Sequence, residues 1–215
     1  MSGKAPNIRR NLLFLAPLAV AALAAAGLLY GKGLVTGKSE PRCPAASLET
    51  ARKLAPLAHG EIAALAVAKT PRMASPLAFT DAAGKKLTLA DFRGRALVLN
   101  LWATWCVPCR AEMPALDRLQ AKEGDPNFEV VAVNVDTARL ERAPAFLNEI
   151  GVKSLSRFSD PSGDSFETLR LAGKALGLPT SLMIDKDGCE IGVVAGPAKW
   201  DSPEAEAAVA TLKGG

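Results

Sequence analysis

The feature that most restricts the fold of this chain is a cysteine pair placed shortly after a buried strand. Residues 96–101 form an apolar run broken only by Asn100, as in a central strand covered on both faces. Cys106 and Cys109 follow, and a helical pattern continues from Val107 to Lys122. Because a buried strand leads directly into a helix, an α/β fold with helices packed on a sheet is predicted.

Two cysteines separated by two residues either bind zinc or exchange disulfides. A structural zinc site needs four ligands, yet Cys43 and Cys189 stand alone and His59 is the only histidine, so no metal site is expected. At a helix N-terminus the free amide N–H groups and the helix dipole stabilise a thiolate. Cys106 is therefore predicted to be the exposed nucleophile. Cys109, one turn further, is predicted to be more buried and to resolve the mixed disulfide.

The two residues between the cysteines indicate the direction of exchange. Pro108 suits the first turn of a helix. Neither Val107 nor Pro108 is basic, whereas a histidine there would stabilise the thiolate and make the pair a stronger oxidant. The pair is predicted to act mainly as a reductant of protein disulfides, with no cofactor besides the Cys106–Cys109 disulfide.

From residue 77 onward, strand and helix patterns alternate. The remaining elements are expected as strands at 128–135, 181–184 and 189–195, and as helices at 143–150, 165–171 and 205–212. Asp187-Gly188 lies between the last two strands and is typical of a β-hairpin. The predicted fold is thus a central mixed sheet flanked by helices on both faces.

The N-terminal part of the chain has the pattern expected of a targeting signal. Residues 12–30 are almost entirely apolar, and residues 1–11 include three basic residues and no acidic one. This pattern predicts a transmembrane helix over 12–30 with a cytoplasmic segment 1–11. A cleaved signal peptide is the alternative, because Ala24-Ala25-Ala26 offers small residues for a peptidase. Both interpretations export the rest of the chain, through a tether over 31–42.

The net charge of +4 does not indicate a nucleic-acid partner. Five basic residues precede residue 39, and without them the chain has 21 basic residues against 22 acidic ones. A protein that neutralises phosphates needs a concentrated basic surface, which this exported part lacks. Binding to nucleic acid is therefore excluded as a function.

Residues 43–76 are predicted to form an extension ahead of the domain at 77–215. Ser47 is expected to cap a helix that ends near Ala58, residues 62–68 fit either helix or strand, and residues 70–76 are typical of a connector. Export favours oxidation of Cys43 and Cys189 to a structural disulfide that joins the extension to the hairpin, with free thiols as the alternative.

Two segments resemble the active site of thioredoxin-like proteins. These are WATWCVPCRAEMP (Trp102 to Pro114) and Gly177-Leu178-Pro179-Thr180. The resemblance implies a thioredoxin fold in which Pro179 is a cis-proline beside the disulfide. It also implies that a substrate chain contacts Trp105, Val107, Pro108, Leu178 and Thr180.

Two further residues place the chain within this family. Asn100 stands where thioredoxin itself has a buried acid for proton transfer. Glu112, three residues after Cys109, matches a glutamate that assists proton movement at the buried thiol in extracytoplasmic reductases; a solvated helix glutamate is the alternative. Peroxidases of similar fold need proline at 99 and threonine at 103, where this chain has Leu99 and Ala103.

The extension and the hairpin resemble the membrane-anchored TlpA-type branch of this family. The matching segments are Ala55 to Glu61, Gly188 to Ile191, and Gly196 to Ala198 with Trp200. The resemblance implies a single-pass protein of the bacterial inner membrane with its catalytic domain in the periplasm. Its implied clients are a Sco-type copper chaperone and subunit II of an aa3-type cytochrome oxidase, and its implied electron donor is a thiol transporter of the DsbD or CcdA kind.

Two other functions remain open from the residues. One is reduction of apocytochrome cysteines during cytochrome c maturation, which uses much the same site. The other belongs to a different class: Cys106 and Cys109 are soft ligands that suit Cu(I), so the chain is also a candidate copper carrier.

Overall fold

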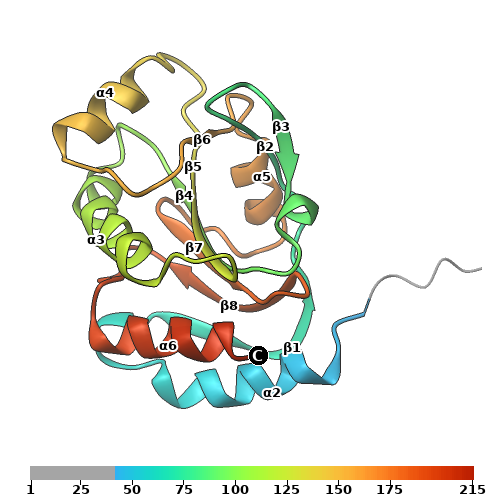
Figure 1. Ribbon diagram of the computed structural model, residues 1–215. Coiled ribbons are helices and arrows are strands. Elements are labelled where there is room, and N and C mark those ends of the chain that lie inside the picture. The colour runs from blue at the N-terminus through green and yellow to red at the C-terminus, as the bar shows by residue number, and fades with distance from the viewer. Residues whose placement is uncertain (1–41) are drawn as a thin grey trace, which may run out of the picture. The chain divides into compact units, whose positions relative to one another are not determined.

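The computed structural model describes residues 42–215 (Figure 1). The expected cytoplasmic segment 1–11, the transmembrane helix 12–30 and the tether up to residue 41 lie outside the described residues. Within 42–215, no helix combines the length and hydropathy that crossing a bilayer requires.

An eight-stranded sheet organises the described residues, with strand order β1-β8-β7-β4-β5-β6-β2-β3 (Figure 1). The strands are β1 Leu65–Met73, β2 Ala78–Asp81, β3 Lys86–Thr88, β4 Ala96–Trp102, β5 Phe128–Asn134, β6 Phe158–Ser159, β7 Thr180–Ile184 and β8 Cys189–Ala195. The central β4 pairs in parallel with β5 and antiparallel with β7, which confirms the predicted mixed sheet.

Helices cover both faces of this sheet. They are α2 Ala45–Leu54, α3 Val107–Glu123, α4 Arg142–Glu149, α5 Asp164–Leu171 and α6 Pro203–Lys213, with short 3-10 turns η1 Ala55–Leu57, η2 Gly60–Ile62 and η3 Leu89–Phe92. Figure 1 shows α3 and α5 on opposite sides of β4 and β5. The helices predicted after residue 77 are therefore confirmed, with ends that differ by a few residues.

The core is built around β4, whose seven residues are all buried. Val98, Leu99 and Leu101 have no exposed surface, as the apolar run predicted. Burying one such side chain contributes about 1.5–3 kcal/mol, so this strand is among the most firmly held elements. The segment that contains Cys106 and Cys109 follows the carboxyl end of this strand and is therefore positioned by the centre of the fold.

Ser47 does not cap the first helix of the extension, so that prediction was wrong. The helix α2 begins two residues earlier, at Ala45, and Ser47 is buried inside it. Its hydroxyl donates instead to Asp185, in the turn between β7 and β8. A partner 138 residues away competes for the hydroxyl, which local sequence could not indicate.

The end of the extension is a strand, whereas residues 70–76 were expected to be a connector. Residues 65–73 form β1, in which Arg72 and Met73 lie opposite Glu190 and Cys189 of β8. Pro71 is tolerated because β1 is an edge strand and the pairing register shifts between Val67 and Arg72. The extension thus belongs to the same sheet as the rest of the fold.

Candidate active site

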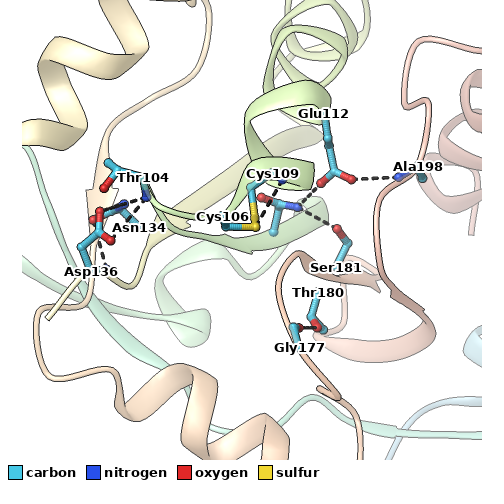
Figure 2. Close-up of a disulfide and its surroundings, with 11 residues drawn as sticks. Thr104, Cys106, Cys109, Glu112, Asn134, Asp136, Gly177, Thr180, Ser181 and Ala198 are labelled. Atoms are coloured by element: carbon cyan, nitrogen blue, oxygen red, sulfur yellow. Dashed lines mark hydrogen bonds between the residues drawn. A yellow bond between two sulfur atoms is a disulfide. The ribbon is translucent and has the colours of Figure 1, made fainter.

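Cys106 lies where β4 passes into α3, as the sequence predicted. It is the N-cap residue of this 17-residue helix, and its Sγ accepts the backbone N–H of Cys109 at 3.3 Å. The two cysteines form a disulfide with Cα atoms 5.3 Å apart (Figure 2). After reduction, the same N–H group and the helix dipole would stabilise a thiolate on Cys106.

The expectation that Cys106 is exposed is not met in the disulfide form. Cys106 is only 4% exposed and Cys109 1%, whereas Trp105 and Val107 are 70% and 75% exposed. The reason is geometric, because the disulfide holds the Cys106 sulfur against the first turn of α3. Pro108 is also exposed. Trp105, Val107 and Pro108 are therefore the exposed residues next to the buried Cys106 in the chain.

The second predicted element lies next to the disulfide. The Leu178–Pro179 peptide bond is cis, which confirms the prediction for Pro179. Thr180 begins β7 and pairs with Leu101 of β4, so the loop meets the carboxyl end of β4 (Figure 2). Leu178 is half-buried. Thr180 is fully buried and donates its hydroxyl to Gly177 O at 2.7 Å, so its side chain helps to shape the loop.

Glu112 is buried one turn beyond Cys109 (Figure 2). Its Oε1 accepts from Asn100 Nδ2 at 2.6 Å and its Oε2 from the N–H of Ala198 at 2.8 Å. Burial raises the pKa of Glu112 to about 7, and the bonds from Ala198 and Asn100 keep it from rising further. The buried indole of Trp200 lowers this pKa slightly, although its N–H makes no hydrogen bond of ordinary geometry. The alternative of a solvated glutamate is therefore wrong.

Asn100 connects this carboxyl group to the sheet. Its amide nitrogen also donates to Ser181 Oγ at 2.9 Å, while its Oδ1 has no hydrogen-bond partner within residues 42–215. The sequence indicated only that a carboxylate is missing at position 100. The structure adds that the neutral amide holds Glu112, and that Ser181 and Ala198 complete the arrangement.

Asp136 is a site residue that the sequence reasoning missed. It follows β5, is 2% exposed and accepts the N–H of Thr104 at 3.1 Å and Asn134 Nδ2 at 3.0 Å (Figure 2). These bonds fix the loop just before Cys106 to the neighbouring strand. The only signal in the sequence was an acidic residue placed directly after a buried strand.

Cys43 and Cys189 form the second disulfide, with Cα atoms 5.8 Å apart. The Met73 sulfur lies 4.0 Å from the Cys43 sulfur and 3.9 Å from that of Cys189. The bond joins the segment before α2 to the first residue of β8, so it ties the extension to the hairpin as predicted.

The Redoxin family profile matches residues 63–209, which include the Cys106–Cys109 pair, Glu112 and the Pro179 loop. The chain belongs to the Redoxin family. This Redoxin chain is 35% identical over 117 residues to the thiol-disulfide oxidoreductase ResA of Bacillus thuringiensis subsp. konkukian. That match covers 54% of this chain and 64% of ResA, so the chain spans slightly less than two thirds of this relative.

Solved structures of similar fold carry related names. A Chlorobium tepidum protein assigned as the thiol:disulfide interchange protein DsbE is 33% identical with a TM-score of 0.55, covering 65% of this Redoxin chain and 95% of that one. A thiol:disulfide interchange protein of the thioredoxin family from Chlorobium tepidum TLS is 26% identical with a TM-score of 0.55, covering 66% and 97%. The thioredoxin-like resemblance of the sequence is confirmed.

Proposed function

We propose that this chain is a thiol–disulfide oxidoreductase that acts mainly as a protein-disulfide reductase. The observation that carries the proposal is the disulfide at the N-terminus of α3, placed between the cis-Pro179 loop and the buried Glu112. Similarity to relatives named as thiol-disulfide oxidoreductases supports the same activity.

The catalytic cycle begins with the reduced pair. The Cys106 thiolate attacks one sulfur of a substrate disulfide, and the other substrate sulfur leaves as a thiolate that takes up a proton. Cys109 then loses its proton and attacks Cys106 Sγ, which releases the second substrate sulfur as a thiol. Two electrons pass to the substrate, and the enzyme ends with the Cys106–Cys109 bond present in this structure.

Glu112 is the proton acceptor for the second step. A carboxyl group whose pKa is about 7 can take the Cys109 proton and release it again near neutral pH. A surface pocket of about 370 Å³, lined in part by Glu112, Arg118 and Lys199, gives the acid a route for proton exchange with water.

The proposed setting is the periplasmic face of the bacterial inner membrane, with residues 12–30 as the anchor. The proposed clients are the copper-site cysteines of a Sco-type chaperone and of cytochrome oxidase subunit II, and a transporter of the DsbD or CcdA kind supplies electrons. Support comes from the apolar N-terminal segment, the TlpA-type motifs and the Cys43–Cys189 disulfide, because such bonds persist in oxidising compartments.

A second candidate is the reduction of apocytochrome cysteines in cytochrome c maturation. Similarity to proteins named ResA and DsbE favours this candidate. The two candidates share the chemistry at Cys106 and differ in the client. Comparing the rates at which the two kinds of client are reduced therefore distinguishes them.

The direction of exchange is tested by equilibrating the Cys106–Cys109 pair with glutathione buffers. We expect a potential below the roughly −180 mV of isomerase-type sites. A potential well above that value would refute the reductant role. The Cys106→Ser variant serves as the inactive control, because it removes the attacking sulfur.

The client is tested by mixing the reduced protein with an oxidised Sco-type chaperone or an oxidised apocytochrome peptide. We expect faster reduction of the chaperone, and faster reduction of the peptide would transfer the function to cytochrome maturation. Stoichiometric Cu(I) retention under glutathione competition, without exchange on either client, would instead establish a copper carrier.

A further inference from the structure

A cavity of about 490 Å³ is lined by Trp105, the residue directly before Cys106, and by Arg110, the residue directly after Cys109. One wall is formed by Thr104 and Trp105, the loop that leads into Cys106. The opposite wall comes from α4 and the residues just before it. Three arginines, Arg110, Arg139 and Arg142, line this cavity, which is called the arginine cleft below.

The arginine cleft carries more positive charge than its own acidic residues balance. Arg110 stacks on Phe146, with its guanidinium 4.5 Å from the ring centre, and lies 3.6 Å from Glu149. Arg139 and Arg142 take part in none of the ion pairs formed within residues 42–215. The guanidinium groups of Arg139 and Arg142 therefore have no ion-pair partner among the described residues.

Two acidic residues, Asp136 and Glu149, line the arginine cleft with the three arginines, so one positive charge remains in excess. The Asp136 carboxylate lines it but is buried and occupied by the Thr104 N–H and the Asn134 amide. Glu149 forms an ion pair with Arg110. Glu141 precedes Arg142 in the sequence and is exposed, but it does not line the cavity.

The backbone at Arg139 supports a functional role for its side chain. Its φ of 55° is the only positive φ of a non-glycine residue in the described part of the chain. This conformation suits glycine and costs other residues about 1 kcal/mol or more. Strained positions of this kind concentrate at binding sites.

We propose that the arginine cleft binds acidic residues that flank the reactive cysteine of a client protein. The inference rests on the proposed function and narrows its client class to cysteine pairs with Asp or Glu beside them. In Figure 2, Thr104 and Asp136 lie on one side of Cys106, and Gly177 and Thr180 lie on another. In the proposed complex, the client residues on one side of the reactive cysteine contact the cis-proline loop. The client residues on the other side contact the arginines.

Trp105 adds to the recognition of this flank. Its side chain is 70% exposed and forms a wall of the arginine cleft, so it offers apolar contact next to the cationic groups. Aromatic and arginine side chains are the residue types that most often dominate binding energy at protein interfaces. The cleft thus combines steering by charge with an apolar anchor.

The test uses three disulfide peptides that differ only in the residues beside the cysteine, which are Asp/Glu, Ser or Lys. We expect the reduced protein to favour the acidic peptide over the basic one by about tenfold in kcat/KM at low ionic strength. The preference should shrink to about twofold or less near 0.5 M salt, because the charges are solvent-exposed and screened.

Two double variants test whether the cleft arginines cause the preference for the acidic peptide. The double variant Arg139→Gln/Arg142→Gln is expected to lose most of this preference. The matched control Arg52→Gln/Lys53→Gln removes the same charge from exposed positions on α2, which lies at the other end of the fold from α4 in Figure 1. The control is expected to keep the wild-type preference.

A small uncharged disulfide separates failure of this inference from failure of the proposed function. If no variant, wild type included, reduces it through Cys106, the proposed function is wrong. If it is reduced while the three peptides react alike, or the control loses as much preference as the cleft variant, the inference is wrong. A rate that depends on Arg139 and Arg142 only with glutathione disulfide also overturns it, because the cleft then binds free glutathione.

Discussion

Glu112 is held near its point of ionisation by three residues from other parts of the chain. Asn100, Ala198 and Trp200 surround a carboxyl group that has almost no contact with water. Desolvation favours the neutral acid and the hydrogen bonds favour the carboxylate, and desolvation wins. The proton affinity of the site is thus determined by packing around one side chain.

The substitution Glu112→Gln should flatten the pH dependence of stability. In the folded protein the acid keeps its proton up to about pH 7, while in the unfolded chain it loses it near 4.5. Stability is therefore expected to fall between these values, by roughly 3 kcal/mol at most. Urea unfolding of the oxidised protein at pH 5 and pH 8 should show a smaller fall for Glu112→Gln than for wild type.

An exposed glutamate provides the control for this measurement. Glu49→Gln on α2 alters a solvent-exposed carboxyl group and is expected to retain the wild-type fall. Equal falls in wild type and Glu112→Gln would show that Glu112 does not titrate in this range. Exchange provides a second readout, since Glu112→Gln should slow the step in which Cys109 loses its proton.

The first turn of α3 is the element that controls the reactivity of the sulfur. Cys106 caps the helix, and Val107 and Pro108 occupy its exposed first positions without carrying charge. Helix N-termini stabilise thiolates through their free N–H groups, and a neighbouring cation adds to the effect. The two residues between the cysteines therefore add no charge to the helix contribution.

The substitution Pro108→His should make the disulfide more oxidising. A protonated imidazole beside Cys106 stabilises the thiolate and with it the reduced form. The potential is expected to rise by about 30 mV or more, which is tenfold in the exchange constant. Glutathione equilibration measures it, with Pro108→Gln as a neutral control. Equal shifts in both variants would assign the effect to loss of the proline.

At the scale of the whole fold, the extension adds an edge strand and a helix to the sheet. The strand β1 pairs with β8 at the edge of the sheet, and α2 contacts β1, β8 and α6. Cys43 and Cys189, 146 residues apart, are joined where these elements meet. Because the disulfide closes a long loop, it removes more conformational freedom from the unfolded chain than from the folded protein.

The double substitution Cys43→Ser/Cys189→Ser should lower stability without altering the redox site. The chain-entropy model gives about 5 kcal/mol for a loop of this length. Urea unfolding measures the loss, and the glutathione potential of Cys106–Cys109 should stay within about 30 mV of wild type, less than a tenfold change. A larger shift in potential would mean that the extension also tunes the active site.

The sequence by itself determined the features that depend on neighbours along the chain. The apolar run of β4, the cysteine pair at a helix start and the Asp-Gly hairpin are local patterns, and each was found where expected. Periodicity and turn preferences act over a few residues, so they can be read without the fold.

Only the tertiary structure decided the properties that depend on distant contacts. The pKa of Glu112 is raised by burial and moderated by the hydrogen bond from Ala198, 86 residues away. The role of Ser47 follows from its hydrogen bond to Asp185. The arginine cleft exists because α4 faces the loop before Cys106. Burial and charge balance arise between segments far apart in the chain, and for that physical reason no local pattern could indicate them.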